Sequence, residues 1–100
     1  MKKMLEKQIE EKVGTYAKEQ GFLVYKFTSP QRSAVPDRLY INPRGFMFFV
    51  EFKRSGQVPT PAQAREHERL RNQGVMGVMV FVIDDVDKGR VMVDQMRLKC

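Results

Sequence analysis

The strongest constraint on the fold is the run Phe46–Phe52, in which both odd and even positions are apolar up to Glu51. Successive side chains of a strand point to opposite faces, so a run that is apolar on both parities indicates a strand covered on both sides. Glu51 and Lys53 end this run on one face, about 6.6 Å apart along the strand. Because an unpaired buried charge is very costly, these two side chains must be solvated, paired or used in chemistry.

A second carboxylate, Asp37, starts another strand-like run that extends to Ile41. Strong turn chemistry at residues 42–45 joins the two runs and predicts a β-hairpin with a four-residue loop. Pairing of these strands would let Asp37 and Glu51 converge on one hard cation, with Lys53 beside it. This constellation is typical of a nuclease.

The composition is that of one globular domain with an excess of positive charge. The 100 residues predict a single domain, residues 1–100, and 18 Lys and Arg against 12 Asp and Glu give a net charge of +6. This excess favours a polyanionic partner, most simply nucleic acid, although it could serve solubility alone. No apolar run approaches the roughly 20 residues of a membrane span, and no secretion signal follows the lysine-rich start. The single cysteine allows no intramolecular disulfide, so an intracellular location without membrane contact is expected.

Apolar periodicity predicts a first helix over residues 2–20, followed by a strand over Phe22–Phe27. Glu10 adjoins the apolar stripe of this helix, so it faces either the sheet or solvent, where a lysine would pair with it. Lys26, near the end of the strand, and Arg32, in the polar loop after it, are either ordinary surface charges or phosphate contacts.

Thr60, Pro61 and Gln63 predict the start of a second helix that ends near Gly74. Thr60 suits the N-cap, Pro61 suits the first helical position, and Gln63 completes a capping box. Gln63 could instead reach the carboxylates, and the two roles compete for one side chain. His67 shares the inward side of this helix and is expected to be a satisfied, half-buried histidine rather than a ligand. A solvated face is expected of the charged residues of this helix: Arg65, Glu66, Glu68, Arg69 and Arg71.

Residues 75–83, rich in valine and methionine, predict a central strand covered on both faces. A last helix after Asp85 could use Met92 and Met96 on its apolar side, although Gly89 weakens it. The order helix, three strands, helix, strand and last helix predicts an α/β fold, a mixed sheet flanked by helices. The helix between two apolar strands indicates a right-handed crossover and a parallel strand pair.

Phosphodiester hydrolysis explains why these residue types would gather. Mg²⁺ prefers oxygen ligands and is usually held by one or two carboxylates plus substrate phosphate. Asp37 and Glu51 supply the carboxylates, and Glu10 could add another. Lys53 could orient the attacking water or offset negative charge in the transition state. No cluster of histidines and cysteines in the sequence indicates zinc.

The segment Pro36-Asp37 … Glu51-Phe52-Lys53 resembles the PD-(D/E)xK nuclease motif. Over roughly residues 6–86 the order of segments resembles the virus-type replication–repair nuclease (VRR-NUC) domain. The matching parts are the N-terminal helix with Glu10, Val35-Pro36-Asp37-Arg38, Phe49-Val50-Glu51-Phe52-Lys53, and Thr60-Pro61-Ala62-Gln63. Ala34 departs from the family's pattern, which usually has glycine two residues before the proline.

The resemblance implies a restriction-endonuclease-like fold and Mg²⁺- or Mn²⁺-dependent cleavage of DNA, with no organic cofactor. The metal would be held by Asp37, Glu51 and the carbonyl of Phe52, with Glu10 as a further ligand, directly or through water. The catalytic set would consist of Glu10, Asp37, Glu51, Lys53 and Gln63. Contacts with DNA are expected from basic residues near the site, namely Lys26, Arg32, Arg38 and Arg54.

Stand-alone members of this family are phage or bacterial proteins similar to Holliday-junction resolvases, and they act as homodimers. The resemblance therefore implies a homodimeric junction resolvase serving DNA repair or recombination, at the nucleoid or in the cytoplasm of a phage host. Two other functions stay open: a nuclease directed at flaps, nicks or ends, and a nucleic-acid-binding module without catalysis. The segment with Met92 and Met96 is a candidate dimer surface unless it packs in the core.

Overall fold

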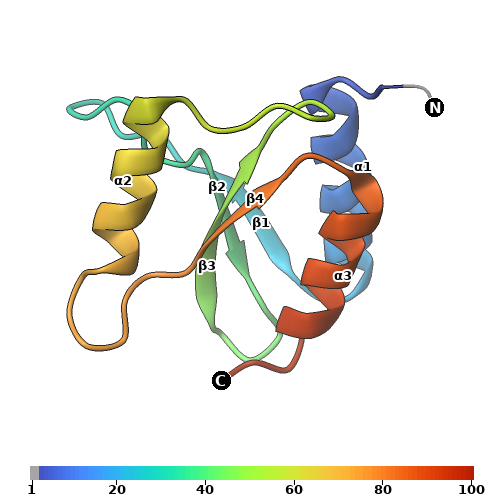
Figure 1. Ribbon diagram of the computed structural model, residues 1–100. Helices are drawn as coiled ribbons and strands as arrows, with labels where there is room; N and C mark the ends of the chain where they lie inside the picture. The colour runs from blue at the N-terminus through green and yellow to red at the C-terminus, as the bar shows by residue number, and fades with distance from the viewer. Residues whose placement is uncertain (1–2) are drawn as a thin grey trace.

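The computed structural model describes residues 3–100, which form three helices and one four-stranded sheet (Figure 1). The elements follow one another as α1 (Glu6–Glu19), β1 (Leu23–Lys26), β2 (Arg38–Ile41), β3 (Met47–Phe52), α2 (Pro61–Arg71), β4 (Val80–Ile83) and α3 (Val86–Met96). This order confirms the predicted α/β succession, including the last helix. The predicted first helix began at residue 2, which lies outside the described residues. Within residues 3–100, none of the helices combines the length and apolar character that crossing a membrane requires.

The sheet has the strand order β1-β2-β3-β4. β1, β2 and β3 are antiparallel neighbours, and the predicted hairpin joins β2 to β3. β3 and β4 run parallel, because α2 carries the chain back across the sheet between them. The predicted mixed sheet with one parallel pair is therefore confirmed.

Asn42 fastens the hairpin to the end of α3. Its Oδ1 accepts hydrogen bonds from the main-chain N–H groups of Arg44 and Phe46 at 2.9 and 2.8 Å. Its Nδ2 donates to the carbonyls of Met96 and Lys99 at 2.8 and 2.7 Å. One buried side chain thus satisfies main-chain groups from two distant parts of the chain.

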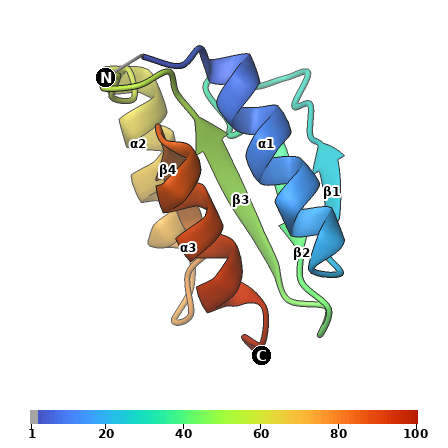
Figure 2. The same cartoon turned by 90° about the vertical axis from the view of Figure 1, so that its right-hand side faces the viewer.

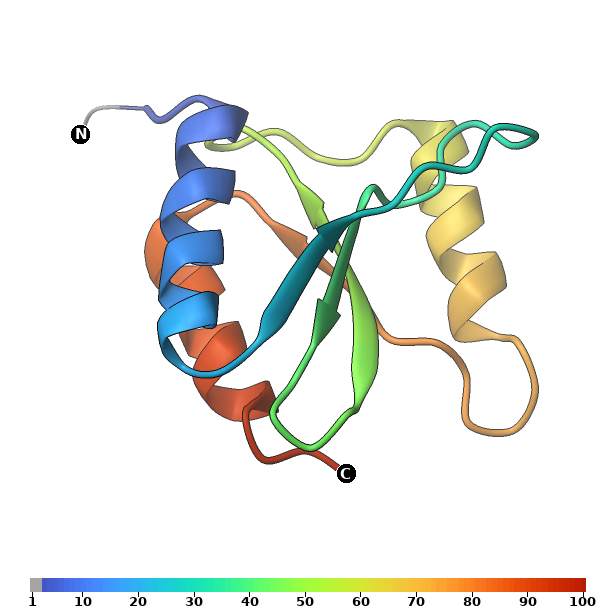
Figure 3. The ribbon, with the colours of Figure 1, turned by 180° about the vertical axis from the view of Figure 1, so that it is seen from behind.

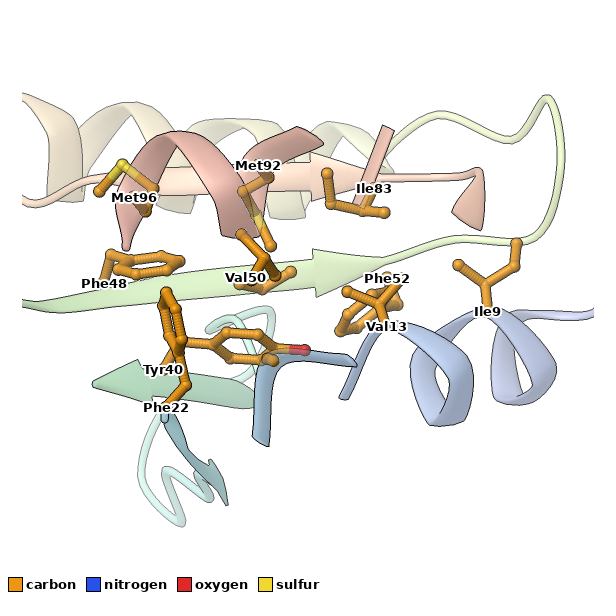
Figure 4. Packing of buried hydrophobic residues seen from close by; sticks show 12 residues of the cluster. Ile9, Val13, Phe22, Tyr40, Phe48, Val50, Phe52, Ile83, Met92 and Met96 are labelled. Atoms are coloured by element: carbon orange, nitrogen blue, oxygen red, sulfur yellow. The ribbon is translucent and has the colours of Figure 1, made fainter. Parts of the chain in front are cut away.

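α1 and α3 cover one face of the sheet (Figure 2), and the apolar core lies between them and the strands (Figure 4). Even-numbered residues of β2 and β3 point into this core, among them Tyr40, Phe48 and Phe52. Met92 and Met96 of α3 also lie in it, 3% and 5% exposed. These methionines therefore pack internally and offer no free surface to a partner.

The opposite face of the sheet is open over β1 and β2. α2 stands on the β4 side of this face (Figures 1 and 3). The odd-numbered residues of β1, β2 and β3 form rows across it, set by the strand register. The two rows toward the hairpin consist of Leu23, Ile41 and Met47, and of Tyr25, Leu39 and Phe49.

The fourth strand is shorter and more peripheral than the sequence predicts. β4 occupies only the last four residues of the predicted strand and lies at an edge of the sheet, not at its centre. Gly74 and Gly77, with φ angles of 67° and 70°, turn the chain before it and leave Val75 and Met76 in an exposed loop. A Cβ on Gly77 would lie 2.2 Å from the carbonyl oxygen of Arg71, so only glycine fits this turn. The glycines override the strand propensity of the valines.

α3 packs against α1 at a buried glycine. A Cβ added to Gly89 would lie 2.3 Å from Cγ2 of Val13 and 3.2 Å from Cγ2 of Ile83. We expect Gly89→Ala to lower the free energy of unfolding by about 1–2 kcal/mol, because overpacking outweighs the gain in helix propensity. Urea unfolding measures this change, and adding Val13→Ala should recover part of it by making room. A Gly89→Ala variant as stable as the parent would contradict this packing.

Candidate active site

Asp37 and Glu51 lie opposite one another on adjacent strands. The register of β2 and β3 pairs Arg38 with Val50, and extending it by one residue brings Asp37 opposite Glu51. The main-chain N–H of Phe27 donates to the carbonyl of Asp37 at 2.8 Å, so the β1–β2 ladder also extends to this level. Directly opposed residues hold their Cβ atoms about 5 Å apart and point to the same face. The predicted strand pairing therefore brings the two carboxylates together.

Glu51 is an ionisable group in a buried position, only 7% exposed. Burial and the negative charge of Asp37 raise the pKa of Glu51 to about 7; the charge of Lys53 lowers it and that of Glu6 raises it. A nearby cation would offset this cost by stabilising the ionised form of the carboxylate. Sequence reasoning missed Glu6, which lies one turn before Glu10 on α1 and acts on the site through its charge.

His67 contacts Glu51 from α2. Its Nε2 lies 3.5 Å from Oε1 of Glu51, and its side chain is 1% exposed. Burial and the positive charges of Arg71 and Lys53 lower the pKa of His67, so the imidazole is neutral near pH 7. The predicted burial is confirmed, but Nε2 has no hydrogen-bond partner among residues 3–100. The sequence spacing of four residues from Gln63 predicted that His67 lies on the inward side of the helix. It did not predict the contact with Glu51.

Glu66 corrects the prediction of a solvated charged face on α2. It is 6% exposed, and its Oε1 accepts a hydrogen bond from Nε of Arg32 at 2.8 Å. The side chain of Arg32 is half exposed, so a buried carboxylate anchors the loop before β2 to the helix. Arg71 is also engaged, because its Nη2 donates to the carbonyl of Val80 at 2.6 Å. The partners of these residues come from other elements, which helical periodicity alone does not reveal.

Lys53 follows β3 on the same face as Glu51. Its main-chain N–H donates to the carbonyl of Ile83 at 2.9 Å, which extends the pairing of β3 with β4. Lys53 is 8% exposed, and its ammonium pairs with no carboxylate among the described residues. Among the described residues, its charge is therefore not committed to an ion pair. Arg54 follows it and is exposed.

Glu10 is held away from Glu51 by Arg38. The guanidinium of Arg38 forms an ion pair with Oε1 of Glu10 and lies 3.4 Å from Oδ2 of Asp37. Glu10 belongs to α1, which covers the face of the sheet opposite to Glu51, and Arg38 bridges Glu10 to Asp37. The side chain of Arg38 is 16% exposed and thus less accessible than expected for a nucleic-acid contact, whereas Lys26 is exposed.

Gln63 takes the capping role. The main-chain N–H of Thr60 donates to Oε1 of Gln63 at 3.0 Å, and the main-chain N–H of Gln63 donates to Oγ1 of Thr60 at 3.1 Å. This reciprocal pair confirms the predicted capping box. The side-chain Nε2 of Gln63 is not used by the cap and lies one turn before His67 on the same side of α2.

The donor set fits a hard divalent cation. Asp37 and Glu51 offer carboxylate oxygens on one face, and Phe52 adds a main-chain carbonyl next in the chain. Among residues 3–100, no three His, Cys, Asp or Glu side chains are close enough to hold a metal ion by themselves. Mg²⁺ fits such a sparse set, because it keeps several waters and takes one or two carboxylates plus phosphate. When bound, such an ion polarises a phosphoryl oxygen and lowers the pKa of water.

Comparison with known proteins decides the family. No family model matches the sequence. A solved structure described as "VRR_NUC domain" aligns with a TM-score of 0.77 and 36% identity, covering 91% of each chain. The chain is also 40% identical over 92 residues to "Putative nuclease p44" of Acyrthosiphon pisum secondary endosymbiont phage 1, covering 92% of this chain and 96% of that protein. The chain belongs to the VRR-NUC nuclease family. Its mixed sheet flanked by helices is the VRR-NUC nuclease fold, as the motifs predict.

In this VRR-NUC nuclease, the buried carboxylate makes stability depend on pH. The pKa of Glu51 in the folded chain, about 7, lies above its ordinary value of 4.5. Its contribution to the free energy of unfolding is therefore fully present below pH 4.5 and is lost as the pH rises through 7. We expect Glu51→Gln in EDTA to raise the free energy of unfolding by roughly 2–3 kcal/mol at pH 8 and by little at pH 4. Urea unfolding at both pH values measures this, with Glu68→Gln as an exposed control. A difference that does not change with pH would contradict the burial cost.

The loop before Asp37 contains a strained alanine. Ala34 has a φ of 66°, in the left-handed region that favours glycine. Because an L-residue in this region costs about 1 kcal/mol, we expect Ala34→Gly to raise the free energy of unfolding by about 0.5–1 kcal/mol. Thermal unfolding measures it. Ala64→Gly within α2 is the control and should lower stability by about 1 kcal/mol. Equal losses in both variants would rule out strain at Ala34.

Proposed function

We propose that this VRR-NUC domain is a Mg²⁺- or Mn²⁺-dependent endodeoxyribonuclease that cuts branched DNA as a homodimeric junction resolvase. One observation carries the proposal. Asp37 and Glu51 are opposed on neighbouring strands, and Lys53 follows Glu51 on the same face. Two crowded carboxylates would repel a DNA phosphate unless a cation lay between them. A module that only binds nucleic acid has no need of this arrangement.

The carboxylates would hold the ion. Asp37, Glu51 and the carbonyl of Phe52 would be direct ligands. Glu10 would join them, directly or through water, when it exchanges its ion pair with Arg38 for the cation. The neutral His67 would limit the movement of the Glu51 carboxylate, because its Nε2 lies 3.5 Å from Oε1 of Glu51 and both side chains are buried.

The remaining groups would act on the substrate. Lys53 would orient the attacking water or offset the negative charge that develops on the phosphate in the transition state. Gln63, through the side-chain nitrogen that its cap leaves unused, would complete the site. Lys53 follows Glu51 on the same face of the sheet, the face from which a phosphate would approach.

Basic side chains around the site would bind the DNA backbone. Lys26 and Arg54 are exposed, and the net charge of the chain is +6. Arg32 donates to Glu66 through Nε, which leaves its Nη groups available to a phosphate. Arg38 would contribute once it releases Glu10. Such contacts supply affinity and position without reading sequence.

A homodimer suits a four-way junction. A closed two-fold pair presents two identical sites, and a junction has two-fold character of its own. Two sites would cut two strands symmetrically, in repair or recombination in the cytoplasm of a bacterium or a phage host. An enzyme directed at flaps, nicks or ends would need only one site for each cut.

Cleavage of a synthetic four-way junction tests the proposal. We expect Asp37→Asn, Glu51→Gln and Lys53→Ala each to lower the rate at least about 100-fold, because each removes a ligand or a charge acting in the transition state. Binding to the junction, measured by fluorescence anisotropy in EDTA, should persist. Full activity in one of these variants would end the role assigned to that residue.

Matched control variants separate an effect on catalysis from an effect on folding, and a comparison of DNA substrates identifies the preferred one. Glu68→Gln and Asp87→Asn change exposed carboxylates outside the site and should cut at the parental rate. EDTA should abolish cleavage, and Mg²⁺ or Mn²⁺ should restore it. A 5′-flap and a linear duplex, tested beside the junction, decide between resolvase and flap- or end-directed activity. Equal cleavage of all three would exclude junction preference.

A further inference from the structure

An uncharged apolar surface adjoins the active-site row on the open face of the sheet. This apolar sheet face consists of Leu23, Tyr25, Leu39, Ile41, Met47 and Phe49. Leu23, Tyr25 and Met47 are 53%, 52% and 58% exposed, and the other three are half-buried. Scattered single apolar residues on a surface are ordinary, but a contiguous patch marks an interaction site.

A second apolar feature projects from the loop between α2 and β4. Val75 and Met76 form its tip, and they are 103% and 93% exposed. The base of the loop is held by the main-chain N–H of Val78, which donates to the carbonyl of Leu70 at 2.9 Å. The Val75–Met76 tip is therefore a structured projection that touches almost nothing in its own chain.

The two features lie on the same side and at the same end of the molecule. The loop after α2 extends to the end of the sheet where the hairpin lies (Figures 1 and 3). Leu23 and Met47 belong to the row of the apolar sheet face nearest that hairpin. Because the tip is fully exposed, it covers none of this face within one chain.

The composition of these surfaces identifies their partner. DNA does not fit them, since interfaces with DNA are strongly positive and none of these side chains is charged. A second copy of this chain does fit, because each copy supplies both an apolar projection and an apolar face. In a two-fold dimer, the tip of each protomer would contact the apolar sheet face of the other.

The exposed area is also of the right size. The tip and the apolar sheet face together expose on the order of several hundred Å² of apolar surface per chain, against about 800 Å² per partner in a stable interface. The polar margin of the patch would supply the remainder.

We infer that two copies of this chain pair by seating the Val75–Met76 tip of each on the apolar sheet face of the other. The inference rests on the proposed homodimer and names its surface. The row of Tyr25, Leu39 and Phe49 is next to the row of Asp37 and Glu51, so each active site borders the interface. Pairing would thereby fix the spacing of the two sites that a double cut requires.

Solution mass, measured by light scattering during size exclusion, tests the surface. The parent chain should have the mass of a dimer. Met76→Glu, and separately Met47→Glu, should weaken dimerisation by about 30-fold or more, the effect of losing a central apolar contact. Both side chains are largely exposed, so each variant should still fold and give a cooperative thermal unfolding transition. Val91→Glu, at a 53% exposed position on α3, is the matched control and should stay dimeric.

Cross-linking tests the contact itself. In a Cys100→Ser background, one chain carries Val75→Cys and another carries Met47→Cys. Mixing them under mild oxidation should give a covalent pair, whereas Val75→Cys mixed with Val91→Cys should not. A monomeric parent would overturn the inference and the homodimer together. A parent dimer that resists both glutamate variants and the cross-link would overturn the inference alone. The cleavage assays test the proposed nuclease activity independently of both of these outcomes.

Discussion

The burial of one carboxylate, Glu51, at the end of an apolar strand is the constraint on which the site depends. β3 is an inner strand between β2 and β4, and the side chains are buried from Val50 to its end at Phe52 and at Lys53, which follows it. A negative charge on Glu51 opposes folding, because the side chain is buried. The neighbouring charge of Asp37 makes ionisation of Glu51 still less favourable. Proteins retain such costs at functional sites and offset them by packing elsewhere. Here the offset comes from the core on the other face of the same strand.

The two faces of the sheet have different tasks. The face under α1 and α3 is filled with apolar side chains and supplies the stability of the fold. The other face carries the acidic pair at one end and a bare apolar surface at the other. Alternation along each strand makes this division possible, since neighbouring residues such as Glu51 and Phe52 serve different faces. The ion pair of Glu10 with Arg38 stands where the two faces meet, near Asp37.

Parts of this arrangement could be predicted from sequence because independent local signals agree. The turn at residues 42–45, the apolar run of β3 and the capping box at Thr60 each fix an element. The register then follows from the hairpin and brings Asp37 to Glu51. The start of β4 could not be predicted, because the turn at Gly74 and Gly77 competes with a strand-forming sequence and prevails.

Contacts between distant elements were equally out of reach. Glu66 is surrounded by charged neighbours in sequence, and its burial depends on Arg32, which lies 34 residues away. His67 meets Glu51 only because the crossover brings α2 over the end of β3. Glu10 was predicted to approach the metal, but the guanidinium of Arg38 that pairs with it is a tertiary contact that no periodicity reveals. In each case the local sequence pattern indicated at most which side of its helix the residue occupies. Its partner could be identified only in the folded structure.

The contact of Arg71 with Val80 has a consequence for self-association. A strand at a sheet margin offers unpaired main-chain groups that can recruit another strand, and endless stacking needs such a margin on both sides. At β4 the guanidinium already occupies one of these carbonyls, so addition of a further strand there would have to displace it. Arg71 thereby makes the β4 edge a poorer template for a strand of another copy.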